Sequence, residues 1–180
     1  MKNEELLEKL KWSMIEWERG CPQRIQHFLK VSSFAATIAK EEGADGHTVF
    51  LVSALGYIHD IGIRLSLERE GRSDGKSQEK HGEPAALQML KELGFTDQDA
   101  ARISMIVGKH HTYDAKIEGL DFRILLEADA CVNMFESDTS QEAKLTMLRD
   151  VFRTAAGKRI YTIMFDLAPE TVSSSSGSNA

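Results

Sequence analysis

The chain has little of several features that define common classes of protein. Its two cysteines, Cys21 and Cys131, form no CxxC spacing, so neither a disulfide framework nor a zinc knuckle is expected. No apolar run reaches the length of a membrane span, and the first residues lack the apolar centre of a signal peptide. The net charge is −6, which disfavours a broad nucleic-acid footprint. These absences predict a cytoplasmic protein that contacts neither a membrane nor a nucleic acid polymer.

What the sequence does have is enough apolar material for one folded domain. Hydrophobic residues make up 42% of its 180 residues, and a chain of this length can bury roughly 70% of its unfolded surface. Such a chain needs no metal merely to fold, so a metal in it would serve chemistry. We expect a single domain over residues 1–168 and a Ser-rich tail at residues 169–180, which has too little apolar surface to pack.

Helical spacing of apolar residues covers most of the chain, and no β-hairpin, internal repeat or glycine-rich phosphate loop is found. The predicted class is therefore all-α. The periodicity and the candidate caps place helices around residues 6–17, over 22–42 behind Pro22, from Asp45 to about Asp60, from Pro84 to Gly94, from Thr96 onward, over 122–132, from a Thr139 and Glu142 capping box to about Gly157, and over 158–167. Residues 64–80 show no such pattern and are predicted to form a polar, lid-like loop.

The most informative residues are an ordered series of histidines and aspartates. The members are His27, His59, Asp60, His81, His110, His111 and Asp129. Imidazole nitrogens and carboxylate oxygens suit first-row divalent metals, and an Asp directly after a His can bridge two ions while the His holds one. The series thus indicates a site for a pair of metal ions.

Several members of the series are expected to face the core. His27 is spaced with Val31 along one helix face, His59 with Leu55 along another, and the same periodicity favours His110 over His111 as the inward ligand. Asp129 falls within an apolar stripe, where an unpaired charge would be costly. A lone inward histidine is usually a hydrogen-bonded core residue. A whole set of buried polar groups is harder to satisfy separately, and a metal is one partner that they can share.

The segments around these residues resemble the HD-domain superfamily of metal-dependent phosphohydrolases. The similar segments are Arg24-Ile25-Gln26-His27, Leu55-Gly56-Tyr57-Ile58-His59-Asp60-Ile61-Gly62 and Leu126-Glu127-Ala128-Asp129-Ala130. His81, before Gly-Glu-Pro-Ala-Ala, and His110 match the positions that add a second metal in the dinuclear branches. The resemblance spans roughly residues 22–136 and implies an HD-domain helical bundle.

The resemblance also implies roles for individual residues. His27, His59, Asp60 and Asp129 would hold one ion, and His81, His110 and the bridging Asp60 a second, with His111 as an alternate ligand. The ions, drawn from Mn, Fe, Co, Ni or Mg, would activate a bridging water for attack on a bound phosphorus. His59 and Asp60 would then be the catalytic residues.

The sequence departs from the motifs of two branches of the superfamily, and these departures limit the classes of substrate that we expect. The paired histidines are followed by Thr112-Tyr113-Asp114 and not by the Gly-Tyr-Pro motif typical of cyclic-di-GMP hydrolases, and Ile61 to Arg64 stand where alarmone hydrolases carry an acidic motif. A small phosphorylated compound, a nucleotide or another phosphoester, remains. Arg24, Arg64 and Lys80 are candidates to contact its phosphate, although a solvated surface role is the alternative for each.

Two other functions stay open on the sequence. A diiron oxygenase similar to myo-inositol oxygenase would use a ligand set of the same composition. A non-catalytic HD module would bind a ligand or a partner without turnover. Trp12 and Trp17 are candidates for core or dimer contacts, so a homodimer is one allowed assembly.

Overall fold

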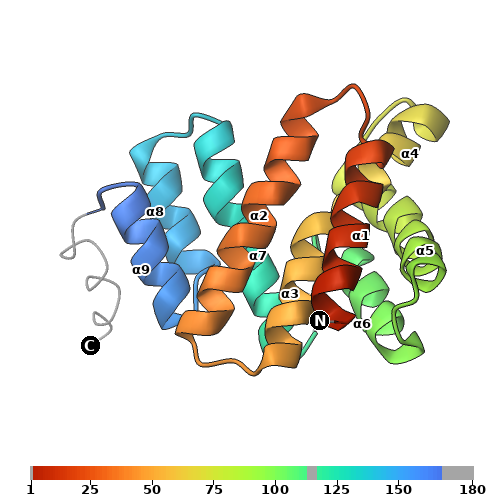
Figure 1. The fold of residues 1–180 in the computed structure, drawn as a ribbon. Helices are drawn as coiled ribbons and strands as arrows, with labels where there is room; N and C mark the ends of the chain where they lie inside the picture. The colour runs from red at the N-terminus through yellow and green to blue at the C-terminus, as the bar shows by residue number, and fades with distance from the viewer. Residues whose placement is uncertain (1, 113–116, 168–180) are drawn as a thin grey trace.

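Helices joined by short linkers make up the part of the protein that the structure describes (Figure 1). The computed structural model describes residues 2–112 and 117–167, and these ranges contain no strand, which confirms the predicted all-α class. The helices are α1 (Lys2–Trp17), α2 (Pro22–Glu41), α3 (Gly46–Ile58), α4 (Gly62–Glu70), α5 (Gly75–Leu93), α6 (Asp97–Val107), α7 (Leu120–Glu136), α8 (Gln141–Asp150) and α9 (Ala155–Met164). The tail predicted at residues 169–180 lies outside the described residues, as do Tyr113 and Asp114. The single-domain boundaries stay a prediction.

Two of the predicted helix caps are confirmed. Asp45 and Thr96 each accept a hydrogen bond from a backbone N–H in the first turn of the helix that follows, and these bonds satisfy donors that have no partner inside the helix. The cap of α8 lies one residue later than predicted. Its N-terminal side-chain cap is Ser140, while Thr139 donates its hydroxyl hydrogen bond to the end of α7.

The prediction of one helix reaching about Gly157 is wrong. The chain leaves the helical path after α8 and begins α9 only behind Thr154. A buried carboxylate explains the interruption. Glu127 of α7 accepts hydrogen bonds from the backbone N–H groups of Arg153, at 2.6 Å, and Thr154, at 2.9 Å. Backbone donors that bond to this carboxylate are not available to a continuous helix.

The lid-like loop predicted at residues 64–80 is also wrong. Helix α4 covers the first part of this segment and α5 the last, so the linker between them is short. Gly71 ends α4 with a left-handed φ of 66°, a conformation that glycine adopts without steric cost. Asp74 then caps α5 by accepting a hydrogen bond from the backbone N–H of Ser77.

The apolar pattern missed α4 and the N-terminal part of α5 because the buried faces there are not apolar. The residues that point inward include Ser66 of α4 and Ser77 of α5, which are 0% and 3% exposed. Pro84, expected at the start of a helix, lies inside α5. A proline there removes one helical hydrogen bond without ending the helix.

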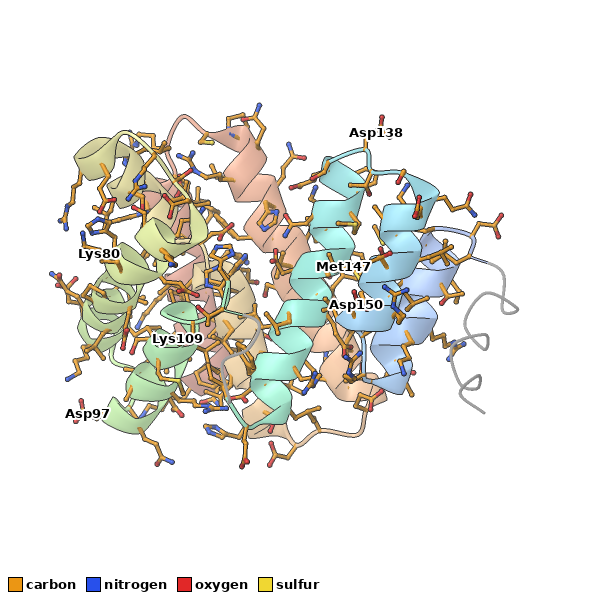
Figure 2. The ribbon with its side chains drawn as sticks, turned by 180° about the vertical axis from the view of Figure 1, so that it is seen from behind. Lys80, Asp97, Lys109, Asp138, Met147 and Asp150 are labelled. Atoms are coloured by element: carbon orange, nitrogen blue, oxygen red, sulfur yellow. The ribbon has the colours of Figure 1, made fainter. Side chains whose placement is uncertain are left out.

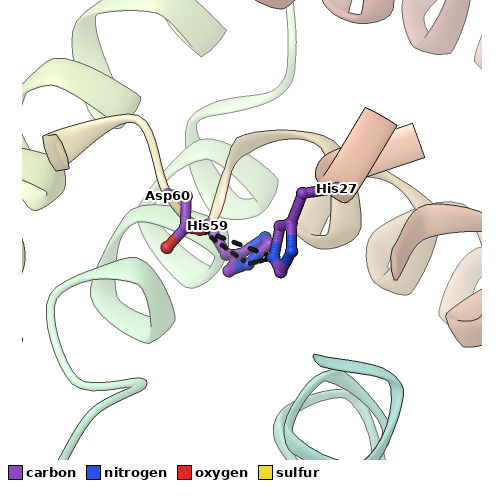
Figure 3. A group of neighbouring side chains, drawn as sticks. All are labelled: His27, His59 and Asp60. Atoms are coloured by element: carbon purple, nitrogen blue, oxygen red, sulfur yellow. Dashed lines mark hydrogen bonds and ion pairs between the residues drawn. The ribbon is translucent and has the colours of Figure 1, made fainter. Parts of the chain in front are cut away.

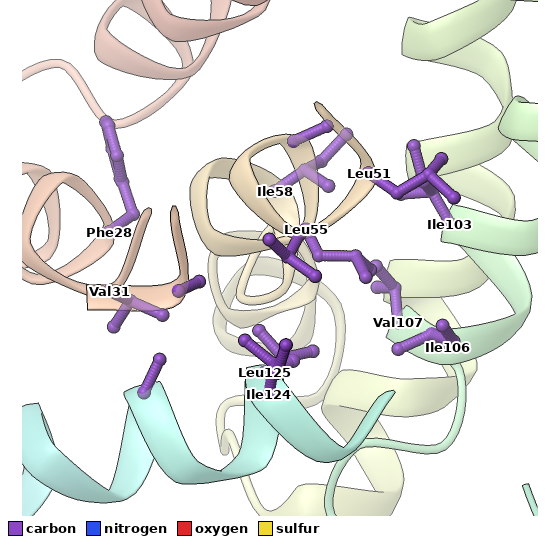
Figure 4. Close-up of a cluster of buried hydrophobic side chains, with 14 of the residues drawn as sticks. Phe28, Val31, Leu51, Leu55, Ile58, Ile103, Ile106, Val107, Ile124 and Leu125 are labelled. Atoms are coloured by element: carbon purple, nitrogen blue, oxygen red, sulfur yellow. The ribbon is translucent and has the colours of Figure 1, made fainter. Parts of the chain in front are cut away.

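Helix α3 forms the centre of the main core. It packs against α1, α2, α6 and α7, and Figure 4 shows its side chains meeting those of α2, α6 and α7. Helices α2 and α3 approach closely at Gly56, where an added Cβ would lie 2.4 Å from the Cα of Ser32. This approach brings the helices that carry His27 and His59 side by side. A second apolar cluster is formed by buried residues of α7, α8 and α9 and their linkers. The partly buried Phe34 and Ile160 pack against both clusters.

One stretch is long and apolar enough to cross a membrane by length and composition, contrary to the sequence-based expectation. It is Gly46–Glu70, and 61% of its apolar window is buried inside the protein. The core helix of a soluble protein passes the same test. The stretch comprises α3 and α4, separated by a turn at residues 59–61.

Candidate metal centre

Four side chains from separate elements converge beside α3. His27 lies in the second turn of α2, His59 caps the C-terminus of α3, Asp60 follows in the turn, and Asp129 lies in the middle of α7. His27 Nε2 is 3.3 Å from His59 Nε2 and 3.2 Å from Asp129 Oδ1. Asp60 Oδ2 is 3.5 Å from both imidazole Nε2 atoms. Figure 3 shows His27, His59 and Asp60 pointing toward one another.

The far side of each imidazole is occupied by an acceptor. Nδ1 of His59 donates to the carbonyl oxygen of Gly56 at 3.1 Å, and Nδ1 of His110 donates to that of Val107 at 2.8 Å. Nδ1 of His27 donates to a carboxylate oxygen of Glu136 at 2.9 Å. When Nδ1 carries the proton of a neutral imidazole, Nε2 carries a lone pair. When the three rings are neutral, as metal binding requires, three lone pairs are therefore aimed into the space where the carboxylates lie.

Two atoms at the site have no conventional partner. Among the described residues, His110 Nε2 and Asp129 Oδ1 are buried side-chain atoms without a hydrogen bond. Burying such an atom unpaired costs free energy, and native proteins do so rarely. A cation accepts electron pairs from nitrogen and oxygen alike, so it would satisfy both atoms at once.

Asp60 faces two groups of ligands with its two oxygens. Oδ2 faces His27 and His59, while Oδ1 is 3.4 Å from His110 Nε2. Candidate metal-holding groups formed by neighbouring side chains are His27, His59 and Asp60 on one side, and Asp60, His110 and His111 on the other. The geometry therefore puts Asp60 between two groups of candidate metal ligands.

The electrostatics of the site favour bound positive charge. Burial by itself would lower the pKa of His27, but the carboxylates of Asp129 and Asp60 outweigh burial and raise that pKa to about 9. Burial would raise the pKa of Asp129, yet its contacts with His27 and His59 hold that pKa below its usual range. Burial would also raise the pKa of Asp60, but the imidazoles of His59 and His110 outweigh burial and hold that pKa below its usual range. Both aspartates are therefore ionised, and protons and metal ions compete for this pocket.

His111 lies beside His110, with ring centroids 3.9 Å apart. Burial, followed by the neighbouring His110, lowers the pKa of His111, which favours the neutral ring that a metal requires. Its Nε2 donates to Gln78 Oε1 at 2.8 Å, and its backbone N–H donates to Glu79 Oε1 at 3.0 Å. These two residues of α5 hold the turn that follows α6, and neither was identified from the sequence.

His81 lies apart from this cluster. Its Nε2 is 2.8 Å from Glu70 Oε1, and its Nδ1 is 3.4 Å from Arg69 Nη1. It belongs to neither of the metal-holding groups formed by the described residues. The structure thus brings His111, and not His81, to the second side of Asp60, while the role of each predicted ligand stays a prediction.

The three candidate phosphate contacts already have partners. Arg24 Nε is 2.6 Å from a carboxylate oxygen of the buried Glu18. Arg64 pairs with Glu68 at 2.9 Å and donates to a backbone carbonyl of α1. Lys80 pairs with Glu70 at 2.9 Å, and Figure 2 shows it on the outside of the molecule.

Two carboxylates that contact residues far from them in the sequence were also not identified from the sequence. Glu127 organises the junction between α8 and α9, and Glu136 contacts His27 across 109 residues. The sequence does carry one signal for Glu136. It lies seven residues after Asp129, a separation that returns to the same face of a helix.

Comparisons with known proteins are consistent with this geometry. The HD domain family matches residues 24–154, a range that includes every residue of the cluster. The chain belongs to the HD domain family. This confirms the resemblance seen in the sequence, and HD domains bind divalent metal ions.

A solved structure shares the fold of this HD domain protein. The crystal structure of a predicted HD superfamily hydrolase from an uncultured Thermotogales bacterium matches with a TM-score of 0.60 and 21% sequence identity. The match covers 94% of this chain and 88% of that chain. A comparison with curated proteins gave no match.

The cluster fits a divalent metal by its spacing as well as by its atoms. Two ligands that each lie about 2.1 Å from one cation are about 3.0 Å apart at octahedral angles and about 3.4 Å apart at tetrahedral angles. The distances that join His27 and His59 to each other, to Asp60 and to Asp129 run from 3.2 to 3.5 Å. The four side chains are thus spaced as ligands of one ion, with small adjustments.

Proposed function

We propose that this HD domain protein is a metal-dependent phosphohydrolase that cleaves a small phosphorylated substrate, a nucleotide or another phosphoester. The single observation that carries the proposal is the convergence of three imidazole Nε2 atoms and two aspartates in one buried pocket, where two of the atoms lack any hydrogen-bond partner. This pocket combines the donor types that suit catalytic divalent metals. The family match supports the same class of reaction.

The proposed roles follow from where each atom lies. His27, His59 and Asp129 would hold one cation, His110 and His111 a second, and Asp60 would offer one oxygen to each. Bound cations would polarise a phosphoryl oxygen and lower the pKa of a coordinated water toward neutrality. The hydrogen bonds to Gly56 and Val107 keep two imidazoles oriented, so the pocket is organised before a substrate arrives.

The substrate is proposed to be small and anionic. Arg24, Arg64 and Lys80 each pair with a carboxylate, and a phosphate would have to displace that carboxylate to use them. We therefore assign most of the neutralisation of the phosphate to the cations. A net charge of −6 opposes binding of a nucleic acid polymer, and we place the reaction in the cytoplasm, away from membranes. A homodimer is compatible with the proposal, and the proposed reaction does not depend on it.

Phosphate release after controlled metal loading tests the proposal. The protein is stripped with a chelator, reloaded with Mn²⁺, Co²⁺ or Fe²⁺, and assayed against a panel of nucleotides and sugar phosphates. Asp60→Ala should lose turnover and at least one metal equivalent while it keeps its helical circular dichroism. Asp97→Ala is the matched control, because Asp97 lies on the outer surface with its side chain 92% exposed (Figure 2).

Three outcomes distinguish the alternatives. Phosphate release by the wild type and Asp97→Ala, but not by Asp60→Ala, supports the proposal. Oxygen consumption by the iron-loaded protein on a polyol or phosphonate substrate, without phosphate release from any substrate, overturns it in favour of a diiron oxygenase. Metal binding with neither reaction would favour a non-catalytic ligand-binding module.

A further inference from the structure

A carboxylate behind the metal centre holds one of its imidazoles. Glu136 is the last residue of α7, and its Oε2 lies 2.9 Å from His27 Nδ1. Its other oxygen, Oε1, lies 2.6 Å from Lys30 Nζ on α2. The Glu136 side chain is 32% exposed, while that of His27 is 9% exposed. The carboxylate thus lies between solvent and the buried face of His27.

The support of His27 differs from that of the other two imidazoles. His59 and His110 each donate Nδ1–H to a backbone carbonyl three residues earlier, on the same local turn. Those acceptors are part of the main chain and no side-chain substitution removes them. His27 depends instead on a side chain from another helix, 109 residues away along the chain.

The orientation of His27 decides whether its Nε2 reaches the cluster. When Nδ1–H donates to Glu136, the ring is fixed and the Nε2 lone pair faces His59 and Asp129. Without an acceptor at Nδ1, the buried ring can take the other tautomer or rotate, and each change moves the lone pair away from the cation position. A negatively charged acceptor also makes Nε2 a stronger donor to a metal.

We propose that Glu136 is a positioning residue that sets the tautomer and orientation of His27 and thereby the affinity of the metal position shared by His27, His59, Asp60 and Asp129. Lys30 supports it by holding the second carboxylate oxygen. This inference rests on the metal centre of the proposed function. It adds the residue that tunes this centre through His27.

Titration with Co²⁺, followed by its visible absorption and by competition with a chelator, tests the inference without any substrate. Removing a partner of this kind typically weakens metal affinity by about 10- to 100-fold, so Glu136→Ala should weaken the tighter Co²⁺ step by that amount. Glu136→Gln keeps a neutral acceptor at Nδ1 and should recover part of the loss. Lys30→Gln should cost less than about fivefold, which is the range of partly exposed ion pairs. Glu8→Ala removes an exposed carboxylate of α1 and should leave the affinity unchanged.

A second readout reports on His27 itself. In the metal-free protein, at an alkaline pH above the His27 pKa of about 9 where the ring is neutral, the ¹⁵N chemical shifts of the His27 ring should report Nδ1–H in the wild type and a shifted tautomer balance in Glu136→Ala. Glu136 is partly exposed at the end of a helix, so the variant should keep wild-type helical circular dichroism. Co²⁺ affinity within twofold of wild type for Glu136→Ala, together with unchanged ring shifts, overturns the inference.

Failure of the inference is distinguishable from failure of the proposed function. A wild-type protein that binds Co²⁺ tightly, loses affinity in Glu136→Ala and releases no phosphate from any substrate would contradict the hydrolase while the role of Glu136 stands. A wild-type protein that hydrolyses phosphoesters and binds Co²⁺ equally well with and without Glu136 would contradict the positioning role alone.

Discussion

Replacing Glu127 should destabilise the fold strongly without emptying the metal centre. The Glu127 side chain is 0% exposed, and it accepts hydrogen bonds from two backbone N–H groups and from the hydroxyl of Thr154. The carboxylate also lies against Gly157, where an added Cβ would be 2.0 Å from Oε2. Glu127→Ala removes the acceptor from all three donors at the start of α9.

The size of the effect can be worked from these contacts. A buried donor left without a partner costs about 1–3 kcal/mol, and water entering the cavity recovers part of the total. We therefore expect a loss of about 3–5 kcal/mol, at the upper end of single substitutions. For a chain of this length each kcal/mol lowers the melting temperature by about 2–4 °C, so a fall of roughly 10 °C is expected.

Thermal unfolding followed by circular dichroism measures this change. Glu142→Ala, which removes an exposed carboxylate from the first turn of α8, is the matched control and should shift the melting temperature by little. Glu127 and Asp129 are two positions apart and face different sides of α7, so folded Glu127→Ala should bind Co²⁺ as the wild type does. A melting temperature within 2 °C of wild type would refute the reasoning about the buried carboxylate.

Three further results are expected. Gly56→Ala should destabilise the protein by more than the about 1–3 kcal/mol typical of overpacking, because the new Cβ meets the Ser32 backbone. Urea denaturation measures this loss, and a neutral effect would contradict the close contact between α2 and α3. Mn²⁺ at about 100 times its Kd should stabilise the protein by about 2.7 kcal/mol in the same assay, and a chelator should reverse the gain; no gain would contradict metal binding to the folded state. Burial raises the pKa of Cys131 to about 12, so a thiol reagent should label Cys21 in the native protein and Cys131 only after unfolding; equal labelling would contradict that burial.

Periodicity and caps carried much of the fold prediction. Asp45 and Thr96 follow local rules that involve only neighbouring residues, and such rules can be applied to a sequence directly. Helix α4 and the first part of α5 could not be found in this way, because Ser66 and Ser77 stand at buried positions where the pattern requires apolar residues. Their burial depends on how α4 and α5 pack against each other, which is a tertiary property.

In the candidate site, too, some features follow from local spacing and others depend on tertiary packing. His27, His59 and Asp129 could be placed on inward helix faces from spacing alone, and the structure brings them together. The contact of Glu136 with His27 joins residues 109 positions apart, and no local pattern encodes such a pairing. The position of His81 beside Glu70 likewise depends on the packing of α4 on α5.

The most direct test of the central claim is a crystal structure of the protein grown with Mn²⁺, with anomalous diffraction recorded at the manganese edge. The account predicts two peaks on either side of the Asp60 carboxylate, one within bonding distance of His27, His59 and Asp129, and one within bonding distance of His110 and His111. An anomalous map without a peak in this pocket, or with Asp60 and Asp129 bonded only to protein groups while manganese lies elsewhere, would contradict it.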